Sequence, residues 1–249
     1  MNELFGSTRT VVAARYALLT PDGFVPSNLP GWQACRVVVN ISPAMGAKFG
    51  QWEVTFGPRG TGAGTTGAFE YFFYVLAGHC VGHLGKKKTR LDAGGYLLLP
   101  PGTSFRFDGA EEGTRLLVFQ KTFVPLAGAK KLPVIIGRQQ TVPGLPFLGN
   151  EKARLQVLLP DRPEFDLAVN IFTYQPGATL PFVESHVMEH GLLMLSGQGI
   201  YRLDHDWHPV QTGDVIWMAP YCPQWFVAMG ETPASYIYYK DVNRPPLAA

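Results

Sequence analysis

Cysteine is scarce in this chain of 249 residues, which contains only Cys35, Cys80 and Cys222. The three are widely spaced and odd in number, and none of them belongs to a C-x-x-C pair. A disulfide framework is therefore not indicated, and a reducing compartment is favoured. We expect Cys222 to act as a small buried hydrophobic residue.

Long hydrophobic runs are also missing. No apolar stretch approaches the roughly 18–20 residues that a membrane-spanning helix needs. The first 15 residues lack the charged start and apolar centre of a secretory signal. We therefore expect a soluble, cytoplasmic protein.

Charge of one sign does not accumulate either. The chain has 21 Lys and Arg against 19 Asp and Glu, for a net charge of +2. The one basic cluster, Lys86-Lys87-Lys88, is typical of an exposed hairpin turn. These features argue against nucleic acid or an anionic membrane as a partner.

Sustained helical periodicity is absent, and Glu151–Leu158 is at most one short helix. Gly (28) and Pro (21) together make up about a fifth of the chain, which indicates many turns. Short runs rich in β-branched and aromatic residues lie between them. Examples are Leu116–Gln120, Leu167–Tyr174 and Ser235–Tyr239. The pattern predicts an all-β protein.

The chain matches itself when it is shifted by 119 residues. Phe69–Gly78 then lies over Met188–Gly197, and Arg90–Pro100 lies over Pro209–Ala219. The identical pairs include Glu70/Glu189, Leu76/Leu195, Gly78/Gly197, Leu84/Leu203, Gly94/Gly213, Phe107/Phe226, Glu112/Glu231 and Lys121/Lys240. Glycines at the same two turns point to an internal duplication. We predict two tandem β-barrels or jelly rolls, with domains at 1–135 and 136–249 joined within Pro125–Asn150.

One short segment carries three potential metal ligands. Glu184, His186 and His190 fall at even spacings, and Gln224 follows 34 residues after His190. In a strand through 184 and 186 both side chains would point to one face, and His190 has the same parity. A carboxylate, two imidazoles and an amide form an oxygen and nitrogen ligand set without thiolate. Such a set suits Mn²⁺ or Fe²⁺ better than a structural zinc.

The spacing of these ligands from Gly197, and of Gln224 from Gly213, resembles the two cupin motifs, although the last position is usually His. The corresponding positions of the first half are Thr65, Gly67, Tyr71 and Phe105. Gly67, Tyr71 and Phe105 are not good metal ligands. The chain therefore resembles a bicupin with one metal site, in its C-terminal half.

A closer resemblance covers most of the chain. Glu-x-His-x₃-His with a distal Gln resembles the pattern of the (S)-ureidoglycine aminohydrolases of purine catabolism. The matching stretches are Tyr16–Pro26, Pro30-Gly31, Ser42–Gly46, Leu195–Tyr201 and Tyr236–Arg244. The resemblance implies Mn²⁺ as cofactor, held by Glu184, His186, His190 and Gln224. It also implies substrate contacts from Tyr201, Tyr236 and Lys240.

The implied reaction replaces the α-amino group of (S)-ureidoglycine by hydroxyl, giving (S)-ureidoglycolate and ammonia. In this reaction Glu184 could move a proton, Lys240 could hold the substrate carboxylate, and Tyr201 could donate a hydrogen bond. We also expect a homo-oligomer, because cupins often associate through exposed strands.

Two other functions fit the motif. A metal-dependent cupin dioxygenase would use Fe²⁺ and O₂, and a non-catalytic bicupin would only bind a small molecule. Gly62–Gly67 matches G-x-G-x-x-G, but the strand-like run Phe69–Leu76 follows it instead of a helix. A dinucleotide site is thus excluded, and a flexible loop is expected there.

Overall fold

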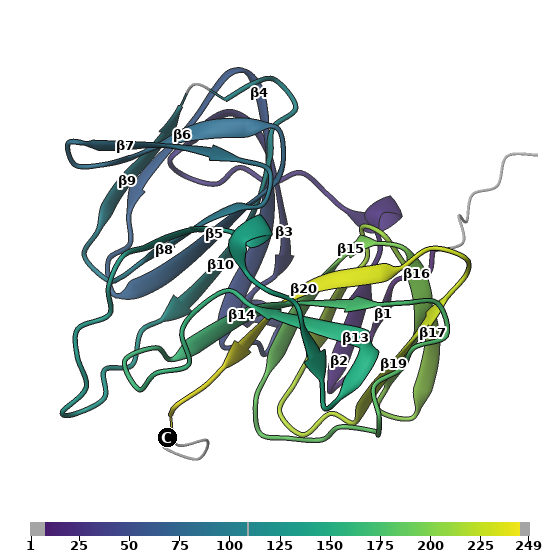
Figure 1. Cartoon of the computed structure of the whole chain (residues 1–249). Coiled ribbons are helices and arrows are strands. Elements are labelled where there is room, and N and C mark those ends of the chain that lie inside the picture. Colours follow the sequence, from purple (N-terminus) through teal and green to yellow (C-terminus); the bar gives the residue numbers. More distant parts are fainter. Residues whose placement is uncertain (1–7, 109, 245–249) are drawn as a thin grey trace, which may run out of the picture. The chain divides into compact units, whose positions relative to one another are not determined.

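The computed structural model describes residues 8–108 and 110–244, and it is built almost entirely of β-strands (Figure 1). Its contacts form two compact units. Of the described residues, the N-terminal unit comprises 25–108, 110–144, 156–169 and 241–244, and the C-terminal unit comprises 8–24, 145–155 and 170–240. The domains expected at 1–135 and 136–249 are contiguous, whereas each of these units draws on both halves of the sequence. That boundary stays a prediction.

The N-terminal unit is organised around one nine-stranded antiparallel sheet. Its strands pair in the order β11-β8-β5-β10-β4-β9-β6-β7. Strand β3 lies outside this order and pairs with β4. The strands are β3 (Trp32–Ile41), β4 (Phe49–Thr65), β5 (Phe69–Ala77), β6 (His79–Leu84), β7 (Lys87–Asp92), β8 (Gly95–Leu99), β9 (Ser104–Asp108), β10 (Arg115–Thr122) and β11 (Ile135–Arg138). In addition to β3, the long β4 pairs with β10 through its first half and with β9 through its second.

The C-terminal unit contains two sheets. The larger has the order β1-β2-β18-β15-β20-β14-β13-β12, and the smaller has the order β17-β16-β19. Their strands are β1 (Val11–Val12), β2 (Tyr16–Leu19), β12 (Leu145–Phe147), β13 (Asn150–Val157), β14 (Leu167–Tyr174), β15 (His190–Ser196), β16 (Gln198–Leu203), β17 (Asp206–Gln211), β18 (Val215–Met218), β19 (Gln224–Met229) and β20 (Ala234–Asp241). Three short 3₁₀ helices complete the described chain, at Pro21–Gly23, Pro43–Met45 and Gln139–Thr141.

Each unit has its own hydrophobic core. Alternate residues of the strands point inward, which explains why Phe73 and Val75 of β5 pack with Leu116 and Val118 of β10. The C-terminal core joins both of its sheets, with residues such as Met194 and Tyr236 from the larger and Phe226 from the smaller. Side chains from two sheets thus fill a common interior, as in a jelly roll. The all-β bicupin prediction is confirmed.

Some predictions for single segments are confirmed, and others are wrong. Leu167–Tyr174 is a strand with the expected bounds, and Lys86 lies in the turn between β6 and β7. The helix at Glu151–Leu158 is wrong, because this segment belongs to β13 and pairs with β12. The loop at Gly62–Gly67 is also wrong in part, since β4 continues to Thr65 and pairs there with β9. In both segments cross-strand pairing overrides the weak local signal.

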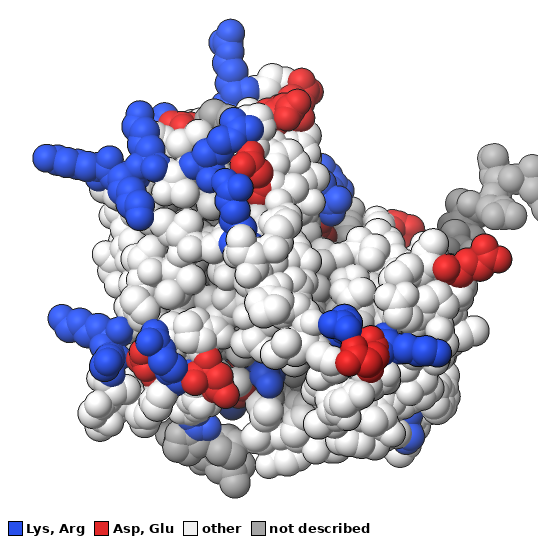
Figure 2. Space-filling view, viewed as in Figure 1, with Lys and Arg blue, Asp and Glu red and all other residues white. Residues whose placement is uncertain are grey.

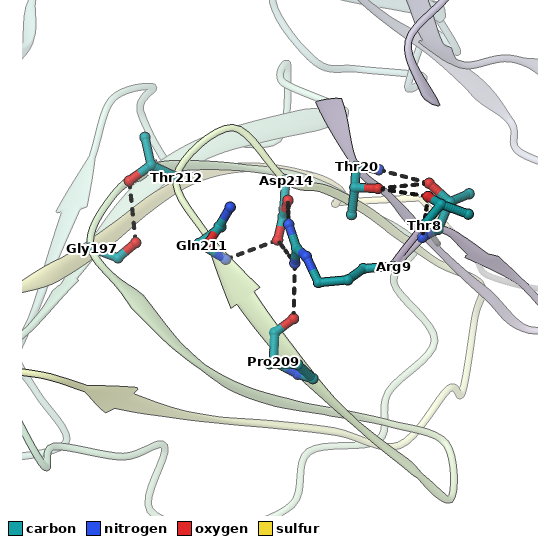
Figure 3. Close-up of polar contacts among 9 residues, drawn as sticks. Thr8, Arg9, Thr20, Gly197, Pro209, Gln211, Thr212 and Asp214 are labelled. Atoms are coloured by element: carbon teal, nitrogen blue, oxygen red, sulfur yellow. Dashed lines mark hydrogen bonds and ion pairs between the residues drawn. The ribbon is translucent and has the colours of Figure 1, made fainter. Parts of the chain in front are cut away.

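The start of the described chain is anchored within the C-terminal unit (Figure 3). The Arg9 guanidinium donates two hydrogen bonds to the Asp214 carboxylate, at 2.6 and 2.8 Å, and a third to the Pro209 carbonyl. The backbone N–H of Gln211 also donates to Asp214, which is fully buried. These contacts bring the segment before β1 to the β17–β18 turn, while β2 pairs with β18.

On the face shown in Figure 2, acidic and basic side chains lie in mixed groups that are separated by wide uncharged areas. Within residues 8–108 and 110–244, no helix is long and apolar enough to cross a membrane.

A buried cluster of charged residues lies in the N-terminal unit. Lys121 forms an ion pair with Asp166, and the Val124 N–H donates to the same carboxylate oxygen at 2.8 Å. Glu70, opposite Lys121 on β5, is fully buried. Burial, and then the adjacent Asp166 carboxylate, raise the pKa of Glu70 well above its usual range, against the opposing charges of Lys121 and Arg244. Burial also tends to raise the pKa of Asp166, but its hydrogen bond with Glu70 and the Lys121 charge lower it overall. Glu70 is thus the protonated partner.

This cluster predicts how stability depends on pH. Above its unfolded pKa, Glu70 is deprotonated in the unfolded chain but protonated in the folded one. The free energy of unfolding should therefore fall as pH rises, by up to about 1.4 kcal/mol per pH unit, until the folded state also loses the proton. Glu70→Gln should remove this contribution. Urea unfolding at several pH values, with exposed Glu112→Gln as control, measures it, and equal slopes for wild type and Glu70→Gln would contradict the assignment.

Candidate metal centre

A cavity of about 210 Å³ opens inside the C-terminal unit. All seven site residues expected from the sequence line it: Glu184, His186, His190, Tyr201, Gln224, Tyr236 and Lys240. Apolar side chains such as Phe172, Leu192 and Met218 form much of the remaining wall. The tertiary structure therefore brings together residues from four strands and from the segment before β15.

The strands place these residues by register. His190 is the first residue of β15 and lies directly opposite Lys240 of β20. Directly opposite residues of an antiparallel pair point to the same face, so both side chains enter the cavity. Tyr201 enters from β16, and Gln224 is the first residue of β19.

The expected strand through residues 184 and 186 does not form. Glu184 makes a single bridge with Gln224, in which each backbone N–H donates to the other's carbonyl at 2.8 Å. The His186 carbonyl accepts a hydrogen bond from the Tyr221 N–H at 2.7 Å, outside any strand. Individual backbone contacts, rather than a continuous strand, carry these two side chains to the cavity.

Three nitrogen atoms converge at one point of the cavity wall. His186 Nε2 lies 3.1 Å from His190 Nε2 and 3.1 Å from Gln224 Nε2. Two ligands at right angles on an ion with bonds of about 2.1 Å lie about 3 Å apart, so this spacing fits adjacent ligands of a first-row metal. Rotation of the Gln224 amide by half a turn would direct its oxygen, the usual ligand atom, toward His186.

The Glu184 carboxylate is not part of the close group that His186 and His190 form. Among residues 8–108 and 110–244, no three His, Cys, Asp or Glu side chains form a group that could hold a metal. Glu184 lines the cavity without joining the two histidines in such a group, and its role as a ligand stays a prediction. Burial raises the pKa of Glu184, and the positive charge of Lys240 partly offsets this effect.

A hydrogen bond orients His190 for metal binding. Its Nδ1 lies 3.2 Å from the Tyr239 carbonyl oxygen, which can only accept, so Nδ1 carries the proton and Nε2 presents its lone pair. Burial, followed by the nearby His186 and Lys240, lowers the pKa of His190 to about 3. The ring is therefore neutral near pH 7, which is the state that binds a metal.

Tyrosine hydroxyls form a second group around the cavity. Tyr201 donates to Gln224 Oε1 at 3.2 Å, and the hydroxyls of Tyr174 and Tyr236 lie 3.1 Å apart. Burial raises the pKa of Tyr201 and of Tyr236, so both stay neutral and can donate hydrogen bonds. This cluster can orient a polar ligand without adding negative charge.

Sequence reasoning missed Tyr238, which also lines the cavity. Its hydroxyl accepts a hydrogen bond from the Asn170 amide at 3.1 Å, and its ring meets His190 edge-on at 5.4 Å. A signal was present, because Tyr236, Tyr238 and Lys240 share the parity of one strand and must face the same side. Asn170, from the distant β14, had no comparable signal.

The arrangement offers a compact polar site in an apolar cavity. It combines a convergent nitrogen group, a carboxylate, the Lys240 ammonium and several neutral hydroxyl donors. Such a set can bind a small anion, polarise it through a bound metal and move a proton.

The similarity of this chain to known proteins shows the family to which it belongs. A cupin domain model matches residues 170–239, a segment that holds six of the seven residues and ends one residue before Lys240. An (S)-ureidoglycine aminohydrolase of Arabidopsis thaliana is 37% identical, covering 99% of this chain and 82% of that protein. The one from Escherichia coli K12 is 35% identical, covering 97% and 94%. The crystal structure of the protein Ylba from E. coli superposes with a TM-score of 0.86 at 33% identity, covering 96% of both chains. The chain belongs to the (S)-ureidoglycine aminohydrolase family of bicupin proteins.

Proposed function

We propose that this protein is a metal-dependent hydrolase that releases ammonia from (S)-ureidoglycine and forms (S)-ureidoglycolate, a step of allantoin degradation in purine catabolism. The observation that carries the proposal is the gathering of Glu184, His186, His190, Tyr201, Gln224, Tyr236 and Lys240 around one cavity. The 35–37% identity to proteins named for this activity supports the choice of substrate.

Glu184, His186, His190 and Gln224 would hold the metal, which we propose to be Mn²⁺. The spacing of the histidine nitrogens and the orientation of His190 by the Tyr239 carbonyl support this assignment. When bound, the ion supplies a Lewis acid that stabilises developing negative charge on the substrate. A neutral amide in place of a second carboxylate keeps the site less negative, which favours an anionic substrate.

Lys240 would hold the substrate carboxylate. Its side chain enters the cavity opposite His190, close enough to influence the pKa of both Glu184 and His190. Tyr201 and Tyr236 would donate hydrogen bonds that fix the orientation of the substrate and thereby its enantiomer. Together these contacts orient the carbon that carries the amino group.

Glu184 would move the proton. Replacement of an amino group by hydroxyl removes a proton from water and delivers one to the departing nitrogen. The Glu184 carboxylate lines the cavity and forms no ion pair that the structure records, so one of its oxygens can accept and return a proton.

The proposed metal site predicts that activity depends on a bound metal. Chelator-treated protein should release ammonia from freshly prepared (S)-ureidoglycine no faster than its spontaneous decay, and added Mn²⁺ should restore release with (S)-ureidoglycolate as product. His186→Ala should not be restored, because the metal loses a nitrogen ligand. His205→Ala removes an exposed histidine at the β16–β17 turn and serves as the matched control.

Circular dichroism would confirm that each variant is folded. Folded, metal-loaded protein without ammonia release would refute the proposed substrate. Oxygen uptake with small organic acids would instead support a cupin dioxygenase.

The proposed role of Lys240 in holding the substrate carboxylate also predicts a kinetic effect. Lys240→Met should lower kcat/KM by about 10–150-fold, mainly through a higher KM, because one charge-assisted hydrogen bond to the substrate is lost. Lys152→Met, an exposed substitution in the same unit, should leave both constants unchanged. Steady-state ammonia release measures the effect, and an unchanged kcat/KM in Lys240→Met would show that Lys240 does not hold the substrate carboxylate.

We further propose a cytoplasmic homo-oligomer that acts on a small molecule and binds neither nucleic acid nor membrane. All three cysteines are free, and two of them are buried. The mixed surface charge of Figure 2 supports the absence of a polyanionic partner. Light scattering of the purified protein tests the oligomer, and a mass equal to one chain would contradict it.

A further inference from the structure

A second cavity, of about 350 Å³, lies in the N-terminal unit. Its wall includes Thr65, Tyr71 and Phe105, which are the counterparts of Glu184, His190 and Gln224 in the repeat of 119 residues. The N-terminal unit has therefore kept an interior cavity at the positions that form the metal centre in the other half. Its volume lies within the range of about 300–1,000 Å³ that is typical of small-molecule pockets.

Strand register identifies one more counterpart. His190 lies opposite Lys240, whereas Tyr71 lies opposite Gln120. The residue that faces the N-terminal cavity in place of Lys240 is therefore Gln120, and Lys121 points to the other face, where it pairs with Asp166. Charged and metal-binding groups have thus been replaced by neutral ones, and no residue that lines this cavity has a charged side chain.

Aromatic rings form a large part of the wall. Trp52 meets Tyr71 edge-on at 5.9 Å, and Tyr71 stacks on Phe73 at 5.7 Å with an angle of 15°. Gly50 and Gly64 leave room beside the rings, because a Cβ there would lie only 3.1 Å from Trp52 and 3.2 Å from Phe105. The result is a space bounded by rings, which suits a flat ligand.

Two polar groups can fix such a ligand. The Gln120 amide donates to the Tyr71 hydroxyl at 2.8 Å, which leaves its oxygen and its second N–H for other partners. The indole N–H of Trp52 is buried and has no hydrogen-bond acceptor among the described residues. Trp52 is 5% exposed. A buried indole N–H is almost always paired, so an acceptor within the cavity would satisfy it.

We propose that this cavity is a second binding site, which takes a neutral planar heterocycle of one or two rings. The ligand lies against Trp52 and Tyr71, accepts a hydrogen bond from the indole N–H and meets the Gln120 amide with a second polar atom. Its neutrality follows from the wall, which has no charge to balance an ion removed from water. The site therefore takes a different class of molecule from the metal centre and does not depend on the reaction there.

Quinoline and indole provide a matched pair of probes. Both are flat, neutral at pH 7 and similar in size, but quinoline offers a nitrogen acceptor, whereas indole offers only an N–H donor. We expect quinoline to bind to metal-loaded protein with a Kd of about 0.05–5 mM, as its size allows. Indole should bind more weakly, and the anion quinoline-2-carboxylate more weakly still. Saturation-transfer NMR and calorimetry measure the three affinities.

Two variants locate the binding. Trp52→Phe keeps an aromatic ring but removes the N–H, and it should weaken quinoline by about 3–10-fold while changing indole little. Val39→Trp adds bulk at a partly exposed residue of the wall and should weaken both probes. Leu145→Trp, at an exposed residue of the C-terminal unit, controls for the added indole and should change neither affinity. Circular dichroism and ammonia release should match wild type in all three variants.

The outcomes are distinct. Quinoline binding that weakens in both cavity variants but not in Leu145→Trp supports the site. No binding of either neutral probe to folded wild type would overturn the proposal. Binding unchanged by both cavity variants would overturn it as well, since the ligand would then lie elsewhere.

Discussion

The pairing of β15 with β20 is the constraint on which the candidate metal centre depends. It sets His190 opposite Lys240, so a neutral imidazole and a cation enter the same cavity from adjacent strands. The pairing also brings the Tyr239 carbonyl to His190 Nδ1, which directs Nε2 toward His186. A shift of one residue would turn every side chain of β20 to the other face and remove Tyr236, Tyr238 and Lys240 from the site together.

The two halves of the chain differ by a shift of this kind in the register of their last strands. In the N-terminal unit β10 pairs with β5 so that Lys121 lies opposite Glu70, on the face away from the cavity. There the lysine stabilises the Asp166 carboxylate beside a protonated Glu70. Lys121 and Lys240 are identical in the repeat of 119 residues, yet one belongs to a buried structural cluster and the other lines the proposed active site. The repeat holds at Tyr71 and His190 but is displaced by one residue at these last strands.

The two cavities also differ in the polarity of the side chains that line them. The C-terminal cavity contains a carboxylate, two imidazoles and an ammonium group, whereas the N-terminal one contains rings, hydroxyls and an amide. Since an ion removed from water needs a partner of opposite charge, the first suits a metal and an anionic substrate. The second suits a neutral molecule. The duplicated fold thus encloses a cavity with charged side chains in one half and a cavity without them in the other.

The sequence by itself determined the all-β class, the duplication, the family and the seven residues that line the C-terminal cavity. The all-β class follows from local alternation, and the duplication and the candidate metal ligands follow from the spacing of residues along the chain. The family and the roles of Tyr201, Tyr236 and Lys240 come from the resemblance to known sequences, and none of these inferences needs knowledge of distant contacts. Only the tertiary structure decided that residues 184 and 186 lie outside a strand, that Asn150–Val157 is a strand, and that residues 8–24 pack in the C-terminal unit. It also decided that Tyr238, which accepts a hydrogen bond from Asn170, lines the cavity and that Lys121 does not resemble Lys240 in position. Each of these depends on which strands pair and in what register, and pairing between distant segments leaves no periodic signal in the chain.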